Sequence, residues 1–587
     1  MNILGYAGLA HDPSVAVLCD GKIRCAIESE KVTRHKHELN VFPEQAMRFA
    51  LKAAGVEWES IECLAVNYDA GPWANRFYLP HLWRFAKSAN FDTGILLNNL
   101  MISASHNPRV FRQMHEYTSP KIARVRHHLA HLASSFPYSP YEEAAVVIFD
   151  AASELECTSA YHCAGRSIRP LYSMDLPNDS LGSVYMLSTR HLGYKMLGDE
   201  YKVMGLAPYG QPHAPFRQFF CRLIRLEPEG RYRVDRTLAG QVFNNGWKFP
   251  HAVSRSLEAR RHPDADFEQI HMDFAYELQR RVEEAMLHVT RHLHKTTGLQ
   301  QLCMAGGVAL NSVANGKILQ ESGFRDVFIP PAAHDAGTSL GAATYQHYYV
   351  QRGERPEPMR HAYYGPSYDD AYIEDELRRC GQSYVRVADP AAAAARCLAD
   401  GRIIGWFQGA TEFGPRALGS RSILADPRQA DTKDKVNRLV KEREGYRPFA
   451  PSLLKEAASQ YLEHVTDSPF MLLVDAVRRE RRHEIPAVVH VDGTARPQTV
   501  EQAVNPLFHR LIDQFRQVTG IPVVLNTSFN VAGEPIVNTP VDAVRCFNAC
   551  GLDALVIGSC IVEKASMRAR PDAKSRETGA PSPALMS

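Results

Sequence analysis

The stretch His127-His128-Leu129-Ala130-His131, followed by Glu143-Ala-Ala-Val-Val-Ile-Phe-Asp150, organises this chain. His127 and His131 are four residues apart, so both imidazoles project from one face of a predicted helix and offer half of a metal site. The apolar run before Asp150 predicts a buried strand, whose carboxyl end points into the crevice where α/β sheets bind ligands. The alternative is two helix-face histidines and an aspartate that caps a turn. The histidines alone favour that alternative; with Asp150 the two interpretations are balanced.

A second acidic residue lies far along the chain, in Pro331-Ala-Ala-His-Asp335-Ala-Gly-Thr-Ser-Leu-Gly341. We interpret Asp335 as another strand-end acid, placed before a glycine-rich helix start. Two histidines and two aspartates suit a borderline metal such as iron or zinc, with coordination positions left for water or substrate. The sequence therefore predicts one metal site, formed by His127, His131, Asp150 and Asp335.

These motifs resemble those of the O-carbamoyltransferase family of antibiotic-tailoring and nodulation-factor enzymes. The resemblance extends from about Ile3 to Glu563. It implies an α/β protein in which a TsaD-like domain of the ASKHA (actin/Hsp70/sugar-kinase) fold precedes an α/β YrdC-like domain. Residues 351–359 are charged and proline-rich and are the best linker candidate. We expect a carbamoyl-transfer domain with metal and nucleotide at 1–355, a carbamoyladenylate-forming domain at 356–563 and a disordered tail at 564–587.

The composition describes an ordinary globular protein of 587 residues, with 45% apolar and 22% charged residues, too long for one core. The formal net charge of +2 provides no general basic field, so no nucleic-acid partner is expected. The 12 cysteines include no CxxC pair, which indicates neither a zinc ribbon nor a disulfide framework. The first residues predict a strand rather than a signal peptide, and no apolar stretch has the length of a membrane span. A cytoplasmic location without a membrane partner is expected.

Strands and turns alternate at the start of the chain, and Asp20-Gly21 between apolar runs predicts a β-hairpin. The preceding Gly/Ala/His/Asp/Ser turn could bring backbone N–H groups close to phosphate oxygens, although an ordinary tight turn is the simpler interpretation. The family carries a histidine at this turn, close to the nucleotide phosphates and the carbamoyl group. Residues 28–37 line the cleft in the family, with a solvated face as the alternative. The catalytic residues expected from the resemblance are His11, Asp12 and Lys36.

Two glycine-containing stretches are candidates for nucleotide binding in the first domain. Residues 198–210 closely match a family segment and suit a helix and turn that pack on a nucleotide. Residues 301–311 combine a strand, a Gly-Gly pair and a helix start, where a nucleotide can lie against the backbone. Close packing is the alternative for a lone Gly-Gly pair, but its counterpart in this fold cradles adenosine. The expected nucleotide-binding residues are Glu200, Lys202, Gly205, Gly306, Gly307 and Asn311.

The second domain carries a dense polar motif at residues 405–422, where glycines and arginines share a short loop suited to bidentate oxyanion binding. More cations follow at residues 434–452, and the rigid Arg-Pro-Phe-Ala-Pro sequence there argues against a salt-bridged helix face. Residues 490–498 and 523–536 add an arginine and a loop of hydroxyls and amides that can hydrogen-bond a carbamoyl group. All four stretches match the family. The expected ligands of carbamoyl phosphate and ATP are Arg416, Arg421, Lys441, Arg443, Arg447, Ser452, Arg496, Asn526, Ser528 and Asn530.

The resemblance implies a reaction in two parts. Carbamoyl phosphate and ATP, with Mg²⁺, would form carbamoyladenylate in the second domain. The carbamoyl group would then move to the hydroxyl of a small molecule in the first domain, which holds iron or another divalent metal. We expect a homodimer. A threonylcarbamoyl-tRNA-type enzyme shares both domain types, but the near-neutral charge argues against it. A hydrogenase-maturation carbamoyltransferase would carry CxxC zinc motifs, which this sequence lacks, and a nucleotide-binding regulatory module would not need two anion sites.

Overall fold

The computed structural model of the chain describes residues 1–8, 11–38, 41–69, 121–154, 156–175, 179–235, 238, 261–441, 443–465 and 467–564. Residues 70–120, whose aromatic-rich sequence predicts helices beside the sheet, lie outside this part. The expected tail lies outside it as well, except for Lys564, whose ammonium donates to the Cys550 carbonyl. In the described residues, no helix combines the length and the apolar character that crossing a bilayer requires.

The chain begins with a five-stranded sheet in the order β3-β2-β1-β4-β5. β1, β2 and β3 pair in antiparallel fashion, and β1, β4 and β5 are parallel. Asp20 and Gly21 link β2 to β3 with φ angles of 50° and 78°, as a two-residue hairpin turn requires, so the predicted hairpin is confirmed. The strands are β1 (Asn2–Ala7), β2 (Ser14–Cys19), β3 (Lys22–Glu28), β4 (Cys63–Val66) and β5 (Lys121–Arg124).

A second five-stranded sheet, in the order β12-β11-β6-β7-β8, repeats this topology. Its first three strands in sequence are antiparallel, and β11 and β12 continue the sheet in parallel with β6. Two copies of one strand order confirm the ASKHA fold class. The strands are β6 (Glu143–Phe149), β7 (Glu156–Ala164), β8 (Ser167–Asp175), β11 (Gln301–Ala305) and β12 (Asp326–Phe328), and a separate ribbon pairs β9 (Ile224–Glu227) with β10 (Arg231–Val234).

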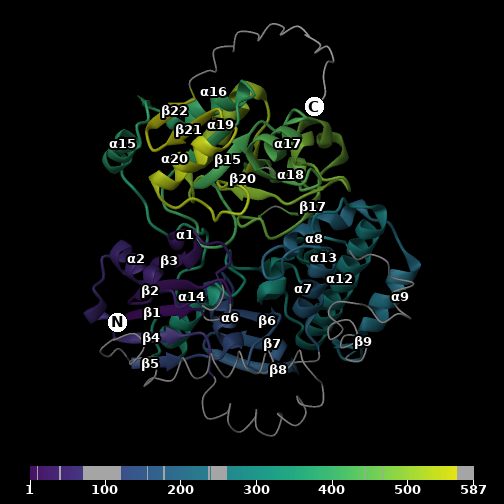
Figure 1. Cartoon of the computed structure of the whole chain (residues 1–587). Coiled ribbons are helices and arrows are strands. Elements are labelled where there is room, and N and C mark those ends of the chain that lie inside the picture. The colour runs from purple at the N-terminus through teal and green to yellow at the C-terminus, as the bar shows by residue number, and fades with distance from the viewer. Residues whose placement is uncertain are drawn as a thin grey trace, which may run out of the picture.

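Helices α6 and α14 lie between the two five-stranded sheets (Figure 1). α14 packs unusually close to its neighbours: a Cβ on Gly341 would lie 1.8 Å from the Ala130 carbonyl oxygen of α6. A Cβ on Gly5 of β1 would lie 2.0 Å from the Ser339 carbonyl oxygen of α14. The helices of this half are α1 (Ser29–Thr33), α2 (Glu44–Ala54), α6 (His127–Ser135), α7 (Leu181–His191), α8 (Glu200–Leu206), α9 (Ala214–Leu223), α12 (Gln269–Thr297), α13 (Ser312–Glu321) and α14 (Gly337–Thr344).

The second half is built on an eight-stranded mixed sheet in the order β13-β22-β21-β14-β15-β20-β16-β19. Side chains of β14 alternate between its faces, with Trp406 packed in one apolar cluster with Phe515 and Phe407 in another with Phe547. α16 and α19 therefore cover one face, and α15 and α20 cover the other. The helices are α15 (Asp370–Arg379), α16 (Pro390–Ala399), α17 (Thr432–Lys435), α18 (Ala458–Tyr461), α19 (Pro506–Thr519) and α20 (Pro540–Ala549).

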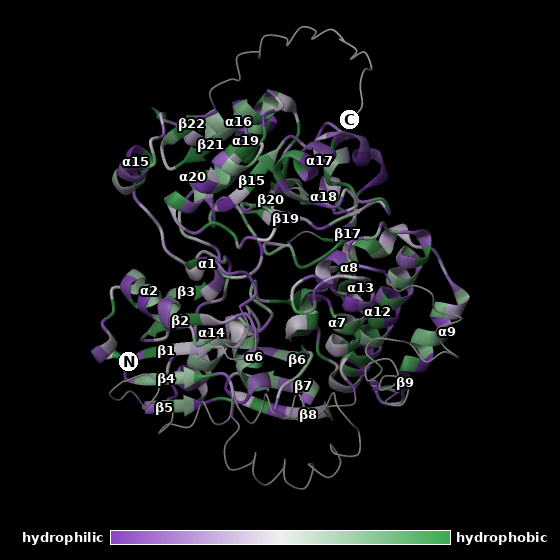
Figure 2. Cartoon of the chain, in the orientation of Figure 1, coloured by the Kyte–Doolittle hydropathy of each residue, from purple (hydrophilic) through white to green (hydrophobic). Residues whose placement is uncertain are grey.

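The strands of this half are β13 (Val385–Arg386), β14 (Ile404–Phe407), β15 (Arg421–Ala425), β16 (Ala450–Leu454), β19 (Gln498–Val500), β20 (Val523–Ser528), β21 (Ala554–Ile557) and β22 (Cys560–Glu563). A separate pair consists of β17 (Asp475–Ala476) and β18 (Thr494–Ala495). Figure 2 shows green, apolar strands inside this half and purple, polar residues on outer helices such as α15 and α17. This distribution is that of a sheet buried on both faces.

The expected linker has no helix or strand, but it is fixed to the first half. The Arg355 guanidinium donates to the carbonyls of residues 136, 137, 139 and 141, and the Met359 N–H donates to Tyr138 O at 2.8 Å. One apolar cluster spans both halves, joining Phe413, Phe470 and Leu472 to residues of the five-stranded sheets. The two halves therefore share a packed interface.

Candidate active site

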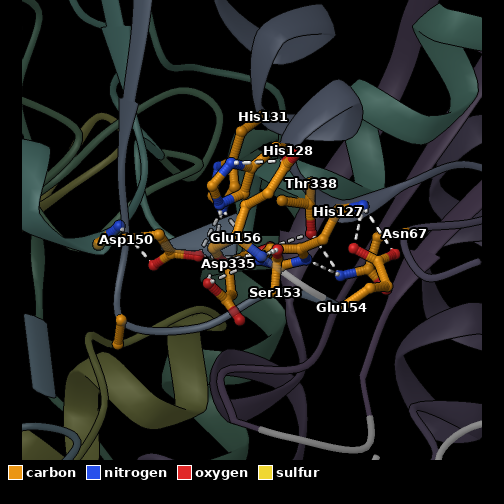
Figure 3. Close-up of polar contacts among 12 residues, drawn as sticks. Asn67, His127, His128, His131, Asp150, Ser153, Glu154, Glu156, Asp335 and Thr338 are labelled. Carbon is orange, nitrogen blue, oxygen red and sulfur yellow. Dashed lines mark hydrogen bonds and ion pairs between the residues drawn. The ribbon is translucent and has the colours of Figure 1, made fainter. Parts of the chain in front are cut away.

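Three of the four expected metal ligands lie where the sequence places them. α6 begins at His127, so His127 and His131 are one turn apart on its buried face. Asp150 directly follows β6, at the carboxyl end of the strand. Figure 3 shows these side chains and Asp335 pointing toward one another.

The prediction that Asp335 lies at the end of a strand is wrong. β12 ends at Phe328, and Asp335 lies in a turn just before α14, which begins at Gly337. Pro330 and Pro331 account for the difference, since proline lacks the N–H that a further strand pairing needs. The turn nevertheless brings the carboxylate of Asp335 to the two histidines.

The four side chains converge at short distances. His127 Nε2 lies 3.2 Å from His131 Nε2 and 3.1 Å from Asp150 Oδ2. Asp335 Oδ1 lies 3.6 Å from His127 Nε2 and 3.7 Å from His131 Nε2. Tetrahedral ligands at about 2.0–2.2 Å from a divalent metal are separated by about 3.3–3.6 Å from one another. The observed separations fit such a set of ligands.

Burial strengthens the case for a metal. All four residues are at most 7% exposed, and Asp335 Oδ1 has no hydrogen-bond partner among the described residues. Burial lowers the pKa of His127, but Asp335 and Asp150 outweigh it and raise that pKa well above 6.5. A buried carboxylate oxygen without a donor is costly, and a cation at this position would remove the cost. The residues present therefore fit a divalent metal.

Surrounding groups hold the ligands in place. The Glu154 carboxylate accepts from the His127 N–H at 3.0 Å and so caps the start of α6, and the Asn67 amide nitrogen lies 3.4 Å from His127 Nδ1. The Gly307 N–H donates to Asp150 Oδ1 at 3.2 Å. Groups of this kind orient metal ligands and tune their basicity. The sequence did not predict the contacts of Glu154 and Asn67 with His127, because an isolated Glu or Asn belongs to no recognisable spacing pattern.

His11 lies beside the metal ligands. Its Nε2 is 3.5 Å from Asp335 Oδ2, and its Nδ1 is 3.1 Å from Asp12 Oδ2. The other oxygen of Asp12 is 3.1 Å from His37 Nδ1. Burial lowers the pKa of His11, but Asp335 and Asp12 raise it to about 10. The structure thus brings two of the three expected catalytic residues, His11 and Asp12, to the metal ligands. These four ligands, His127, His131, Asp150 and Asp335, are called the His/Asp cluster below.

Lys36, the third expected catalytic residue, faces the other half of the chain. Its charge is one of those that lower the pKa of Lys441, after burial, Arg443 and Arg447. Lys36 is therefore near the C-terminal cations, and its catalytic role stays a prediction.

Lys202 and Gly205 line the contact between the two halves, whereas Glu200 contacts its own segment. Glu200 accepts from the N–H groups of Leu197 and Gly198 at 2.8 and 2.7 Å. Lys202 Nζ lies 3.5 Å from Glu444 Oε1, and a Cβ on Gly205 would lie 3.4 Å from Pro448. In this structure the α8 segment contacts the second half, and nucleotide binding by these residues stays a prediction.

Gly306 and Gly307 lie beside the metal ligand Asp150, and Asn311 lies at the start of α13. Gly306 has φ +96°, and a Cβ on it would lie 2.1 Å from the Phe149 carbonyl oxygen, so this glycine permits a close approach to β6. Asn311 caps α13 by accepting from the Ala314 N–H at 3.1 Å, and its amide nitrogen donates to Gln279. Gly307 supports Asp150, as described above. These contacts accord with close packing and leave the nucleotide role untested.

A cluster of cations gathers in the second half, formed by Arg416, Arg443, Arg447 and Arg496. Burial and the three other arginines lower the pKa of Arg496 well below 12.5, and burial with Arg447 lowers that of Arg443 to about 9. In the part of the chain that the structure describes, Arg416 and Arg496 form no ion pair, and the Nε of each lacks an acceptor. Partly buried guanidinium groups without carboxylate partners are suited to bind an oxyanion.

Arg421 does not join this arginine cluster. It is fully buried, and its guanidinium donates to the carbonyls of Gln408 at 2.8 Å and Gly409 at 3.1 Å. It also lies 3.6 Å from the ring centre of Phe407. These contacts occupy the two terminal nitrogens of Arg421, whereas its Nε has no acceptor among the described residues, and its role as a ligand stays a prediction.

The remaining expected ligands form two polar networks. The Asn526 amide donates to Ser452 Oγ at 2.9 Å and to Gln498 Oε1 at 3.1 Å. Lys441, which is 3% exposed, donates to Ser528 Oγ at 3.2 Å and to Asn530 Oδ1 at 2.7 Å. Gln498 was not among the expected ligands, because a glutamine in a strand carries no signal of its own.

Two family models and several known proteins match this chain over most of its length. The Carbamoyltransferase N-terminus family model matches residues 2–344, and the Carbamoyltransferase C-terminus model matches residues 395–564. Nodulation protein NolNO of Sinorhizobium fredii is 40% identical over 562 residues, which cover 94% of this chain and 79% of that protein. Nodulation protein NolO of Bradyrhizobium diazoefficiens is 41% identical over 446 residues, which cover 75% of this chain and 79% of that protein.

Among solved structures, full-length HypF in its phosphate- and nucleotide-bound form aligns with 58% of this chain and 54% of its own, at 12% identity and a TM-score of 0.33. The repeated strand order of the two five-stranded sheets, and not this alignment, defines the fold.

Proposed function

The chain belongs to the carbamoyltransferase family, and from this premise we propose that it is an ATP-dependent O-carbamoyltransferase acting on a hydroxyl of a small molecule. The arginine cluster (Arg416, Arg443, Arg447 and Arg496) is the observation that carries the proposal. Four partly buried cations, of which Arg447 alone has a carboxylate, that of Glu444, within ion-pair distance among the described residues, indicate an anionic substrate. The His/Asp cluster of the first half fits a divalent metal and so suits the transfer step.

In this proposal residues 356–563 make carbamoyladenylate. Carbamoyl phosphate, ATP and water give carbamoyladenylate, phosphate and pyrophosphate, so the site must hold several phosphate groups at once. The arginine cluster offers bidentate donors for those oxygens, and Mg²⁺ would accompany ATP. The Ser528 and Asn530 side chains, fixed by Lys441, provide neutral hydrogen-bonding groups for the carbamoyl moiety.

Residues 1–355 would then carry out the transfer. A divalent metal held by His127, His131, Asp150 and Asp335, which we propose to be iron, would supply Lewis-acid polarisation of the carbamoyl carbonyl. His11 takes the proton of the acceptor hydroxyl while that oxygen attacks the carbamoyl carbon, and AMP leaves. Asp12 orients the His11 ring through Nδ1. Neutralisation of Asp335 by a cation would weaken the effect that raises the pKa of His11, which favours the neutral, basic imidazole.

Contact between two loops supports passage of the intermediate from one site to the other. Gly414, two residues before Arg416, lies against Pro331, four residues before Asp335, and a Cβ on it would be 2.6 Å from the Pro331 carbonyl oxygen. The loop of the arginine cluster therefore touches the loop that carries a metal ligand. A short path would protect a reactive acyl phosphate from bulk water.

The relatives direct the choice of acceptor. NolNO and NolO are named as nodulation proteins. We propose that the acceptor of this chain is a hydroxylated natural product, with saccharides that resemble nodulation factors as the first class to examine.

The test incubates the purified chain with carbamoyl phosphate, ATP and Mg²⁺, and measures pyrophosphate release. A panel of chitin oligosaccharides, aminoglycosides and macrolides is then added, and products are examined by mass spectrometry for one added carbamoyl group. The proposal predicts pyrophosphate release that requires carbamoyl phosphate, and AMP formation that requires an acceptor. Pyrophosphate release that is independent of carbamoyl phosphate would refute the first step. A variant with all four arginines of the cluster replaced by Gln should lose the signal.

A further inference from the structure

The Arg416 loop (residues 412–416) belongs to the second half of the chain but is held by two residues of the first half. Glu28 Oε1 accepts from the Gly414 N–H at 2.6 Å. Lys31 Nζ donates to the carbonyl oxygens of Glu412 at 2.6 Å and Gly414 at 2.9 Å. Glu28 and Lys31 also form an ion pair with a separation of 2.8 Å. The backbone on both sides of Gly414 is thus fixed from β3 and α1.

Both charged residues are removed from water. Lys31 is 1% exposed and Glu28 is 4% exposed. Burial raises the pKa of Glu28, and the charge of Lys31 opposes that rise. Removing two charges from water costs several kcal/mol per ion, and an apolar pair of similar size is often as stable. Stability alone therefore does not account for an ion pair at this point of the interface.

The opposite side of the Arg416 loop is fixed as well. Gly414 has φ +117°, a conformation that favours glycine, and it packs on Pro331 of the first half. The Glu412 carboxylate accepts from the N–H groups of Leu418 and Ser420, both at 2.8 Å. The backbone next to Arg416 can therefore move only if contacts to the first half are broken.

Arg416 is the member of the arginine cluster that belongs to this loop. Its Nε has no acceptor in the part of the chain that the structure describes, and its charge, like those of Arg443 and Arg447, lowers the pKa of Arg496. We propose that Glu28 and Lys31 are positioning residues for the anion site, so that adenylate formation in the second half depends on the first half. This inference rests on the proposed function and extends it from the ligands to the residues that place them.

The test uses the full-length chain with the double substitution Glu28→Gln and Lys31→Met. Both side chains are then neutral, the Gln oxygen still accepts from Gly414 N, and only the two lysine hydrogen bonds and the ion pair are lost. We expect a folded protein whose KM for carbamoyl phosphate, measured by pyrophosphate release, rises about 10- to 100-fold. A role in stability alone would lower the thermal midpoint but leave that KM unchanged.

Two further variants separate the outcomes. Asn315→Ala removes the interdomain hydrogen bond to Leu472 O, at 2.9 Å, without touching the Arg416 loop or the expected ligands, and it should lower the thermal midpoint but leave the KM unchanged. Glu28→Asp keeps both charges but shortens the reach to Gly414, and it provides the same readout if the double variant does not fold. An unchanged KM in the folded Glu28 variants overturns the inference. Absence of carbamoyl-phosphate-dependent pyrophosphate release in the unsubstituted protein would instead refute the proposed function.

Discussion

Two buried imidazoles whose Nε2 atoms lie 3.2 Å apart, with carboxylates on two sides, need a proton or a metal between them. A shared proton would satisfy one pair of atoms, whereas Asp335 Oδ1 would still lack a donor among the described residues. A divalent cation satisfies all four groups at once. The metal explanation is therefore the more complete one.

This geometry yields the first prediction. Asp335→Asn should reduce metal content, measured by elemental analysis after dialysis against a weak chelator, by at least about tenfold. Carbamoyl transfer should fall with it, while pyrophosphate release from carbamoyl phosphate and ATP should persist. His128→Gln is the matched control, because His128 is equally buried on α6 but contacts Ser159 Oγ, at 2.6 Å. Full metal content in Asp335→Asn would contradict the assignment.

His11 carries the second prediction. His11→Asn should spare adenylate formation and lower carbamoyl transfer by about 10²–10⁴-fold, the usual contribution of a positioned general base. The reason is its place 3.5 Å from Asp335, on the metal side of the interface and apart from the arginine cluster. Both half-reactions are assayed with the acceptor that the panel identifies. His35→Asn, at a side chain 83% exposed, is the control. Equal loss of both half-reactions, or of neither, would rule out this role.

Individual residues were predictable where their signal is local. The spacing of His127 and His131 and the strand before Asp150 are short-range patterns, and the structure places all three as expected. Asp335 was assigned to the correct cluster but to the wrong local structure, because the Pro-Pro pair ends the strand early. Glu28 could not be predicted, since its partner Gly414 is 386 residues away and the sequence shows only one charge in a charged segment.

At the scale of elements, the Arg416 loop is held on both sides of Gly414 by residues of the first half. Positive φ angles occur at both Gly409 and Gly414, yet the surroundings of these glycines differ. A Cβ on Gly409 would meet nothing within 4 Å, whereas one on Gly414 would meet the backbone of Pro331. An alanine at Gly409 would therefore cause backbone strain alone, whereas an alanine at Gly414 would also displace the loop.

The third prediction uses this pair. Gly409→Ala should cost about 1 kcal/mol from backbone strain and leave the KM for carbamoyl phosphate unchanged. Gly414→Ala should cost more, about 2–3 kcal/mol, and should raise that KM because the loop must move away from Pro331. Thermal unfolding and pyrophosphate release provide the two measurements. An equal KM in both variants would show that the position of the loop does not affect the anion site.

Most elements near the sites follow from sequence patterns. The hairpin at Asp20-Gly21 and the buried strand at Glu143–Phe149 have turn and apolar signals of their own. The α8 segment was harder, since a glycine-rich match to a nucleotide-binding family does not reveal that Lys202 and Gly205 contact Glu444 and Pro448. Contacts between domains depend on surfaces that no single segment encodes.

At the scale of the molecule, the two halves are joined by buried contacts of several kinds. Apolar side chains such as Phe470 and Leu472 belong to the same core cluster as the strands of the first half. Polar contacts add to them, among them the Asn315 amide, which is fully buried and donates to Leu472 O at 2.9 Å. Separation of the halves would expose this apolar surface and leave polar groups unpaired.

The fourth prediction follows from this shared core. Calorimetric unfolding of the full chain should show one transition, although the sequence predicts two domains. Inorganic phosphate as a probe of the arginine cluster, and zinc as a probe of the His/Asp cluster, should each raise that one midpoint. A ligand at a hundred times its dissociation constant adds about 2.7 kcal/mol to the stability of the unit that binds it. If the halves unfold together, each ligand stabilises the whole chain, and the combined effect exceeds either alone.

Substitution of Asp335 by Asn should abolish the response to zinc and retain the response to phosphate, which serves as the internal control. Two transitions, each shifted by only one of the ligands, would mean that the halves unfold independently. Glu28 and Lys31 could then position the Arg416 loop in the native protein without coupling the unfolding of the two halves.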